Sequence, residues 1–472
     1  MSASFLASAL IQFALGLVVA WLLGPAEFGV YALALAGAVL LQNLTLEWLR
    51  LCATRFHHAA EGGRLARRLH ALFLRLGAGL FGLSILLFLF GGAQRIVLAL
   101  VPLLSIAAGF ADLRAALMRA EFDQRGYALF MLLRNALAIV LLPLAAHVFG
   151  EAAMVLAAFL TSLVLASLIL AGARRGKGAD AAVQADGEMQ PLGTLLGYAM
   201  PIVATNCLYL GLFFVLRSGV AWFGGLAAAG QFSLALDFGL KLFTTIGTAL
   251  DLMLFQFAVR DQRELGDAAG MARLTDNLGK VVAVVLPMAI GLWLVAPALE
   301  PWLVAPAFRG PFAAFLNALL PGLTLYLVVQ FGLHPFLQLE RATLGLVGAA
   351  GIAVAVGLSA AFLAYGLALP PAGAIAMVLT GAMAGATLRL LMRIGRAAML
   401  PVGLFGRLGL ALGAMVAGVS LMERLVVGLP GLVLMVLAGG VTYGALAYVT
   451  DLAGIRTLVR MRRREKEART IS

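Results

Sequence analysis

The chain has 472 residues, of which 63% are hydrophobic and only 12% are charged, and its mean hydropathy is +1.02. A soluble domain carries about a quarter charged residues, so the composition excludes a large soluble domain and indicates a polytopic membrane protein. The net charge of +12 does not indicate a nucleic-acid partner, because the basic residues separate apolar runs and are not interleaved with aromatic residues in a polar domain.

Apolar runs long enough to cross a membrane, which takes about 20 residues, follow one another along the chain. Fourteen are expected to be transmembrane helices, and the first six lie at about 4–23, 29–49, 71–92, 95–117, 128–149 and 152–171. The other eight lie at about 195–221, 226–256, 279–299, 311–338, 342–366, 371–393, 402–421 and 428–449. The first run lacks a preceding Lys or Arg and a clear cleavage site, so we expect a retained helix and not a signal peptide.

The basic residues predict the orientation of these helices. With the N-terminus in the cytoplasm, the cytoplasmic segments hold 29 of the 34 Lys and Arg residues, and the outer loops hold only Arg95, Arg309 and Arg424. Basic residues collect on the cytoplasmic side of a membrane. We therefore expect a multi-pass membrane protein with both termini in the cytoplasm.

The predicted fold is all-α, with two six-helix lobes followed by two further helices. The lobes are expected at 1–171 and 195–393, with a polar cytoplasmic linker at 172–194 between them. The two further helices are expected within 394–455, and a basic tail at 456–472 is expected to lie near anionic lipid headgroups. Cys52 and Cys207 are not expected to form a disulfide, because one lies beside an arginine-rich loop and the other lies in an apolar run.

One loop sequence occurs twice. WLLGPAEFGVYALAL at Trp21–Leu35 and WFGGLAAAGQFSLAL at Trp222–Leu236 share seven of fifteen residues at an offset of 201. Six expected spans separate the copies, so both face the same side, which predicts a parallel repeat of the two lobes. GEAAMVL at Gly150–Leu156 and GAIAMVL at Gly373–Leu379 support this repeat. Within the first copy, Gly24 and Gly29 are expected to permit a tight reversal.

Three segments carry a family resemblance. LGPAEFGVYALAL after the first apolar run, RAEFDQRGYALFMLLRNALAIVLLPLA at Arg119–Ala145 and YGLALPPAGAIAMVL at Tyr365–Leu379 resemble Wzx-type polysaccharide flippases of the multidrug/oligosaccharidyl-lipid/polysaccharide (MOP) superfamily. The resemblance implies a carrier that moves undecaprenyl-diphosphate-linked oligosaccharide repeat units from the cytoplasmic to the periplasmic leaflet by alternating access. It implies a location in the bacterial inner (cytoplasmic) membrane and a role in O-antigen (lipopolysaccharide), exopolysaccharide or capsule biosynthesis.

Other functions stay open at this stage. A MATE-type drug/ion antiporter usually has an acidic residue in its first helix, and Met1–Leu23 has none. A lipid II flippase is expected to have several arginines in its first two helices, whereas here Arg50 stands alone at the end of the second run. The implied partners are the lipid-linked oligosaccharide and membrane lipids, with a polysaccharide polymerase and chain-length proteins as further candidates. No phosphate loop, zinc spacing or nucleophile elbow is present, so we expect no enzyme activity, metal or cofactor.

Ionisable residues within apolar runs are candidates for cargo contact, because they are expensive in a membrane. Asp237 and Lys241 are four residues apart on one helical face, where they either fix helix packing as a neutral pair or meet a diphosphate or sugar acid. Arg217 is expected to snorkel to the outer headgroups or to line the cleft, and Arg134 to contact inner headgroups or cargo. His334 before Pro335 is expected to have a structural role.

Further polar residues suggest helix contacts and a gate. Gln12 and Asn206 are expected to form interhelical hydrogen bonds. The offset of 201 maps Arg50 onto Asp251, so the two occupy equivalent places near the inner headgroups and are candidates for an inner gate. The alternative is that Arg50 pairs with Glu47 in its own half.

Overall fold

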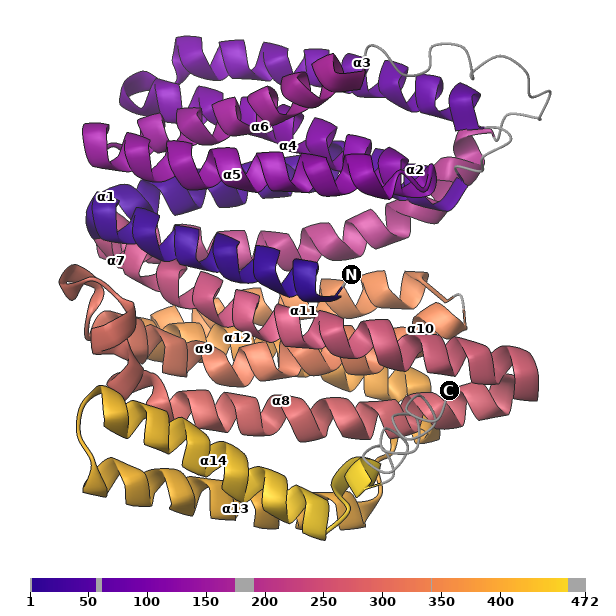
Figure 1. The fold of residues 1–472 in the computed structure, drawn as a ribbon, viewed down its shortest axis with the longest axis vertical. Helices are drawn as coiled ribbons and strands as arrows, with labels where there is room; N and C mark the ends of the chain where they lie inside the picture. Colours follow the sequence, from indigo (N-terminus) through magenta and orange to yellow (C-terminus); the bar gives the residue numbers. More distant parts are fainter. Residues whose placement is uncertain (1, 57–61, 175–190, 341, 457–472) are drawn as a thin grey trace, which may run out of the picture. The chain divides into compact units, whose positions relative to one another are not determined.

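The computed structural model describes residues 2–56, 62–174, 191–340 and 342–456 (Figure 1). These residues form helices and no strands, as the apolar runs predict. All of the expected tail except Arg456, and most of the expected linker, lie outside the described residues. Twelve of the described helices are long and apolar enough to cross a membrane, which agrees with a multi-pass membrane protein.

The chain divides into two compact units, Met1–Leu234 and Ala235–Ser472. The first contains α1 (Ser2–Thr45), α2 (Glu47–Phe56), α3 (Gly62–Phe90), α4 (Arg95–Ala120), α5 (Gln124–Phe149), α6 (Ala152–Arg174) and the first part of α7 (Leu192–Leu265). The second contains the rest of α7, α8 (Asp267–Leu303), α9 (Pro311–Leu327), a π-helical turn (Val328–Leu333), α10 (His334–Leu339), α11 (Leu344–Gly366), α12 (Pro371–Ile394), α13 (Val402–Leu425) and α14 (Leu429–Val449).

Two of the twelve long helices are each interrupted at a glycine, at the place where the sequence predicts a loop between two spans. The 44 residues of α1 are interrupted at Gly24 (φ 73°, ψ 172°), and the 74 residues of α7 are interrupted at Gly225 (φ 80°, ψ 173°). Both conformations lie in a region that glycine adopts without steric cost. The two copies of the repeated loop therefore share one backbone geometry. The expectation that Gly29 takes part in the reversal is wrong, because Gly29 lies within the helix that follows and has no positive φ.

Acidic side chains fix several helix starts. Asp123 accepts a hydrogen bond from the Gly126 amide at 2.9 Å at the start of α5, and Glu27 accepts one from the Ala152 amide at 2.8 Å at the start of α6. Glu300 accepts hydrogen bonds from the amides of Gly310 and Ala313 at the start of α9. The first amides of a helix lack partners within the helix, so these carboxylates have structural roles in the loops.

The core of the first unit is built around α4. This helix packs against α1, α3 and α6. One apolar cluster joins α2, α3 and α4 to the start of α7 through Leu195, Ala199 and Val203. Cys52 is fully buried in this cluster, and its Sγ lies 3.6 Å from the Leu195 carbonyl oxygen.

The second unit has a core formed by α8, α9 and α12. α9 packs against both of the other helices, α11 pairs with α12, and the α13–α14 hairpin packs against α8.

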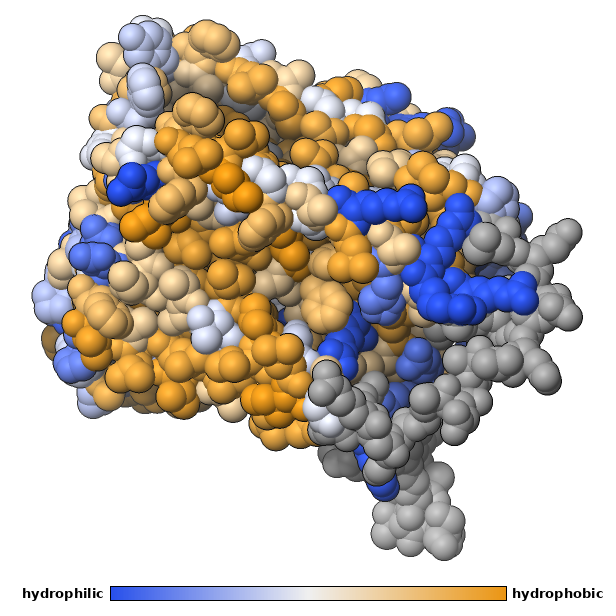
Figure 2. Space-filling view, turned by 90° about the horizontal axis from the view of Figure 1, so that it is seen from above, coloured by the Kyte–Doolittle hydropathy of each residue, from blue (hydrophilic) through white to orange (hydrophobic). Residues whose placement is uncertain are grey.

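The visible face in Figure 2 is mostly apolar, with strongly polar side chains gathered toward its margins. Many large apolar side chains are exposed, such as Phe90, Trp222 and Val427, which is the surface expected of a protein in contact with lipid tails.

Candidate functional site

A cluster of polar side chains lies inside the first unit, between helices that are otherwise apolar. Asp112 of α4 accepts a hydrogen bond from Gln42 Nε2 of α1 at 2.8 Å and faces Arg134 Nη1 of α5 at 3.5 Å. Gln42 is buried, whereas the side chains of Arg134 and Asp112 are 22% and 36% exposed. The cluster therefore has a buried side and an open side, and the open side carries both charges.

Two neighbouring contacts extend this cluster along α1 and α5. Gln12 Nε2 of α1 lies 3.4 Å from Asn135 Oδ1 of α5, which confirms the interhelical hydrogen bond expected for Gln12. Asp112 also interacts electrostatically with Arg50 of α2. Polar groups from α1, α2, α4 and α5 are thus brought close together in a unit whose spans are apolar.

Arg50 is bound by Glu47 of the same helix, through hydrogen bonds from both Nε and Nη2. Glu47 is buried, while the Arg50 side chain is 31% exposed. The paired carboxylate raises the pKa of Arg50, so the guanidinium stays charged. This is the partner that the sequence offered as the alternative to Asp251, and the gate between Arg50 and Asp251 stays a prediction.

Arg217 lies in the first part of α7 and is only 6% exposed. The side chain is therefore covered by protein and does not extend onto the lipid-facing surface that snorkelling would require. A buried arginine needs polar partners, so we expect the Arg217 guanidinium to face the interior of the protein and not the lipid. Whether the cargo touches it stays a prediction.

Lys241 and Asp237 lie in the second unit, in the part of α7 that follows Gly225. Lys241 is half-buried and interacts electrostatically with Asp237, as their spacing on one helical face predicts. The helix supports the pair in a segment where Thr244 and Thr245 bond back to carbonyl oxygens one turn earlier. A cation with one carboxylate neighbour can exchange that neighbour for an anionic ligand.

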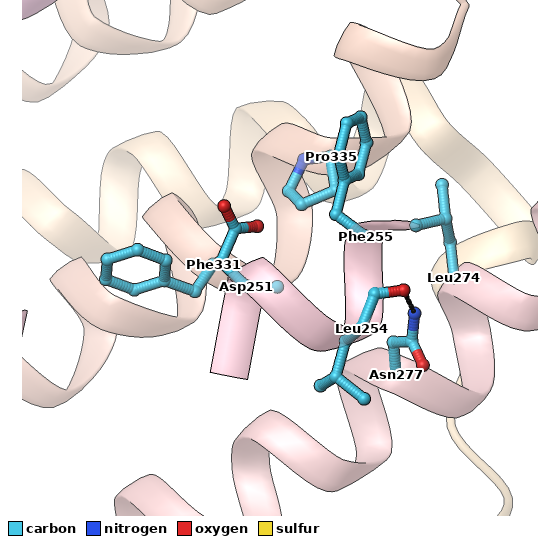
Figure 3. Close-up of a pocket in the computed structure, with 8 residues that line it drawn as sticks. Asp251, Leu254, Phe255, Leu274, Asn277, Phe331 and Pro335 are labelled. Carbon is cyan, nitrogen blue, oxygen red and sulfur yellow. Dashed lines mark hydrogen bonds between the residues drawn. The ribbon is translucent and has the colours of Figure 1, made fainter. Parts of the chain in front are cut away.

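Asp251 lines a small pocket of the second unit, together with Asn277, Phe331 and Pro335 (Figure 3). In this view its carboxylate lies between the Phe331 ring and Pro335. The Asn277 amide donates to the Leu254 carbonyl oxygen at 2.8 Å and not to Asp251. The pocket has a cavity volume of about 10 Å³, about the room that one water molecule needs and far below the roughly 300–1,000 Å³ of sites for drug-sized ligands. It is too small for an oligosaccharide.

His334 follows the π-helical turn and is buried in the second unit. Pro335 has no N–H to donate to the preceding turn, and the helix is irregular at this point. The burial fits the structural role expected from the sequence.

Sequence reasoning missed Asp112 and Gln42. Asp112 was a detectable signal, because it is an ionisable residue inside the apolar run at 95–117. Its partners were not detectable, since Gln42 and Arg134 lie 70 and 22 residues away in the chain. Among the described residues no group of three or more His, Cys, Asp or Glu side chains is arranged to hold a metal ion.

Comparison with solved structures identifies the fold. A structure described as "Lipid II flippase MurJ, inward closed conformation" matches with a TM-score of 0.74 and 14% identity, over 97% of this chain and 100% of that chain. An inward-facing multidrug resistance MATE family transporter of the MOP superfamily matches with a TM-score of 0.52 and 18% identity, over 84% of this chain and 95% of that chain. A structure of the MATE P26A mutant matches with a TM-score of 0.56 and 19% identity, over 84% of this chain and 95% of that chain. No family model and no curated protein matches the sequence. The chain has the fold of MOP-superfamily proteins.

Proposed function

We propose that this protein is a flippase that moves undecaprenyl-diphosphate-linked oligosaccharide repeat units from the cytoplasmic to the periplasmic leaflet of the bacterial inner membrane. The observation that carries transport of a lipid-linked cargo is the likeness to a structure described as a lipid II flippase, which covers 97% of this chain, whereas the MATE structures leave about a sixth of it unmatched. The choice of an oligosaccharide as cargo rests on the three sequence segments that resemble Wzx-type flippases. The repeat units would serve O-antigen, exopolysaccharide or capsule synthesis, with a polymerase and chain-length proteins as partners.

Each unit, taken by itself, has a cation that suits a diphosphate group. Arg134 of the first unit has Asp112 as its carboxylate neighbour, and Lys241 of the second unit has Asp237. In the empty carrier the carboxylate balances the cation, so no lone charge is left in an apolar environment. When cargo enters, the diphosphate takes the place of the carboxylate as the partner of the cation. Arg217 is a further candidate for contact with the cargo.

This exchange explains how binding can be both specific and reversible. An anion left unpaired in a low-dielectric site costs several kcal/mol, so the cations select for a charged headgroup. The neighbouring carboxylates then compete with the cargo for the same cations, which favours its release.

A lipid II flippase is the second candidate, because the structure with a TM-score of 0.74 is described as one. Lipid II also carries a polyprenyl diphosphate, so the same cations would serve. The expected arginines of the first two spans are absent here except for Arg50, which pairs with Glu47. A MATE-type antiporter is the third candidate, because MATE structures share the fold.

Complementation separates these candidates. The gene is expressed in a strain that lacks its polysaccharide flippase, in a strain depleted of its lipid II flippase, and in a drug-hypersensitive strain. The proposal expects surface polysaccharide to return in the first strain. Growth of the second strain without repair of the first would assign lipid II as cargo, and drug resistance alone would assign antiport.

A further inference from the structure

The helices that follow the two copies of the repeated loop touch through their backbones. Gly29 of α1 and Gly230 of α7 are both buried, and both belong to the first unit. A methyl group on Gly29 would lie 3.0 Å from the Gly230 amide nitrogen and would overlap the Leu226 carbonyl oxygen. Real Cβ atoms essentially never approach backbone atoms so closely, so this crossing requires glycine at position 29.

The contact is reciprocal. A methyl group on Gly230 would lie 2.9 Å from the Gly29 amide nitrogen and would overlap the Pro25 carbonyl oxygen. Gly29 and Gly230 are 201 residues apart, and so are Pro25 and Leu226, which is the offset of the sequence repeat. The repeat therefore places equivalent backbone atoms against one another about a local two-fold axis.

The requirement for glycine is specific to these two positions of the repeat. At Gly24 and Gly225, which form the turns, a methyl group would have no neighbouring atom within 4 Å. Gly16 and Gly219, on the helices that lead into the turns, also have open space around them. The turn glycines serve backbone conformation, whereas Gly29 and Gly230 serve close approach.

We infer that the Gly29–Gly230 contact is a gate, which closes the transport path on the side of the membrane that carries the two loops. Helices in backbone contact leave no passage between them at this level. Gly230, Asp237 and Lys241 fall at i, i+7 and i+11 of one helix, so the contact and the proposed cargo charges share a helical face. The contact consists of weak backbone interactions, so it can open without breaking an ion pair.

This inference rests on the proposed function, because a gate presupposes transport. Its test, however, measures how fast a reagent reaches a reporter cysteine, and not the movement of cargo. Ala36 is seven residues beyond Gly29 on the same face of α1, about 10 Å further along the helix. A single reporter cysteine is introduced as Ala36→Cys in a Cys52→Ala/Cys207→Ala background. A membrane-impermeant maleimide is then applied to right-side-out and to inside-out membrane vesicles.

Gly29→Ala should make labelling from the loop side about tenfold faster and should slow labelling from the opposite side, because a methyl group holds the two helices apart. Gly230→Ala, with its methyl group on the other helix, should have the same effect. The double variant should add little, since either methyl group alone opens the shared contact. Gly219→Ala is the matched control and should leave labelling unchanged.

Membrane abundance is measured for every variant. If Gly29→Ala is not inserted into the membrane, Gly230→Ala provides the same test of the contact. Labelling that stays unchanged in both variants would overturn the gate. Labelling that rises equally from both sides would also overturn it, because that result indicates loosened packing. A one-sided shift in a protein that moves no lipid-linked oligosaccharide would support the gate and contradict the proposed cargo.

Discussion

Removing the carboxylate of Asp112 should destabilise the first unit mainly through the hydrogen bond to Gln42. Gln42 is 7% exposed, so Asp112→Ala leaves its buried amide without this acceptor. An unsatisfied buried donor costs about 1–3 kcal/mol. The ion pair of Asp112 with Arg134, whose side chains are 36% and 22% exposed, adds only about 0–1 kcal/mol.

The two contributions are separated by Asp112→Asn, which keeps an oxygen acceptor for Gln42 and removes the charge. Thermal unfolding of the detergent-purified protein should show a clear loss for Asp112→Ala and less than half of it for Asp112→Asn. In a double-mutant cycle, Asp112→Ala and Gln42→Ala should be less than additive. Asn43→Ala is the matched control, because that amide bonds to the Val39 carbonyl oxygen in its own helix.

Equal losses for Asp112→Ala and Asp112→Asn would refute this reasoning, since the charge and not the hydrogen bond would then stabilise the cluster. Additive losses in the cycle would show that Gln42 and Asp112 are not coupled.

Three further predictions concern function and reactivity. Lys241→Ala should abolish complementation at normal membrane abundance, and Lys241→Arg should retain part of it. Arg260→Ala, in the exposed pair with Glu264, should be neutral. Normal polysaccharide from Lys241→Ala would exclude its cargo role. If Arg50 and Asp251 form a gate, Arg50→Asp and Asp251→Arg should each impair transport, and the double exchange should restore much of it. Losses without recovery would show that Arg50 pairs with Glu47 and not with Asp251. Burial raises the pKa of Cys52 to about 11, so thiolate forms only as the pH approaches that value. In a Cys207→Ala background the native protein should react slowly with maleimide at pH 8 and rapidly once denatured, and rapid native reaction would contradict the burial.

The helical fold could be predicted from the sequence because each span carries its own signal. Length and hydropathy alone define a transmembrane helix, and the repeat of Gly24 at Gly225 indicated matching turns, which the two backbone conformations confirm. The proximity of Glu47 to Arg50 was also visible, as a spacing of three residues on a helix.

The polar cluster and the glycine contact could not be predicted in the same way. Asp112 meets Gln42 only because α4 packs against α1, and that packing depends on contacts distributed over both helices. Gly29 looked like a turn glycine in the sequence. The structure shows that glycine is needed there because the Leu226 carbonyl oxygen, from a residue 197 positions away in the chain, occupies the place of a side chain. A single sequence shows local geometry well and contacts between distant segments poorly.

The central claim is tested most directly by leaflet translocation in proteoliposomes that contain only this protein and a fluorescent undecaprenyl-diphosphate oligosaccharide. A glycan-cleaving enzyme added outside reports the fraction of lipid in the outer leaflet. The account predicts that the wild-type protein makes the inner-leaflet pool accessible, and that Lys241→Ala at equal reconstitution does not. An inner-leaflet pool that remains protected in wild-type proteoliposomes, as in protein-free liposomes, would contradict it.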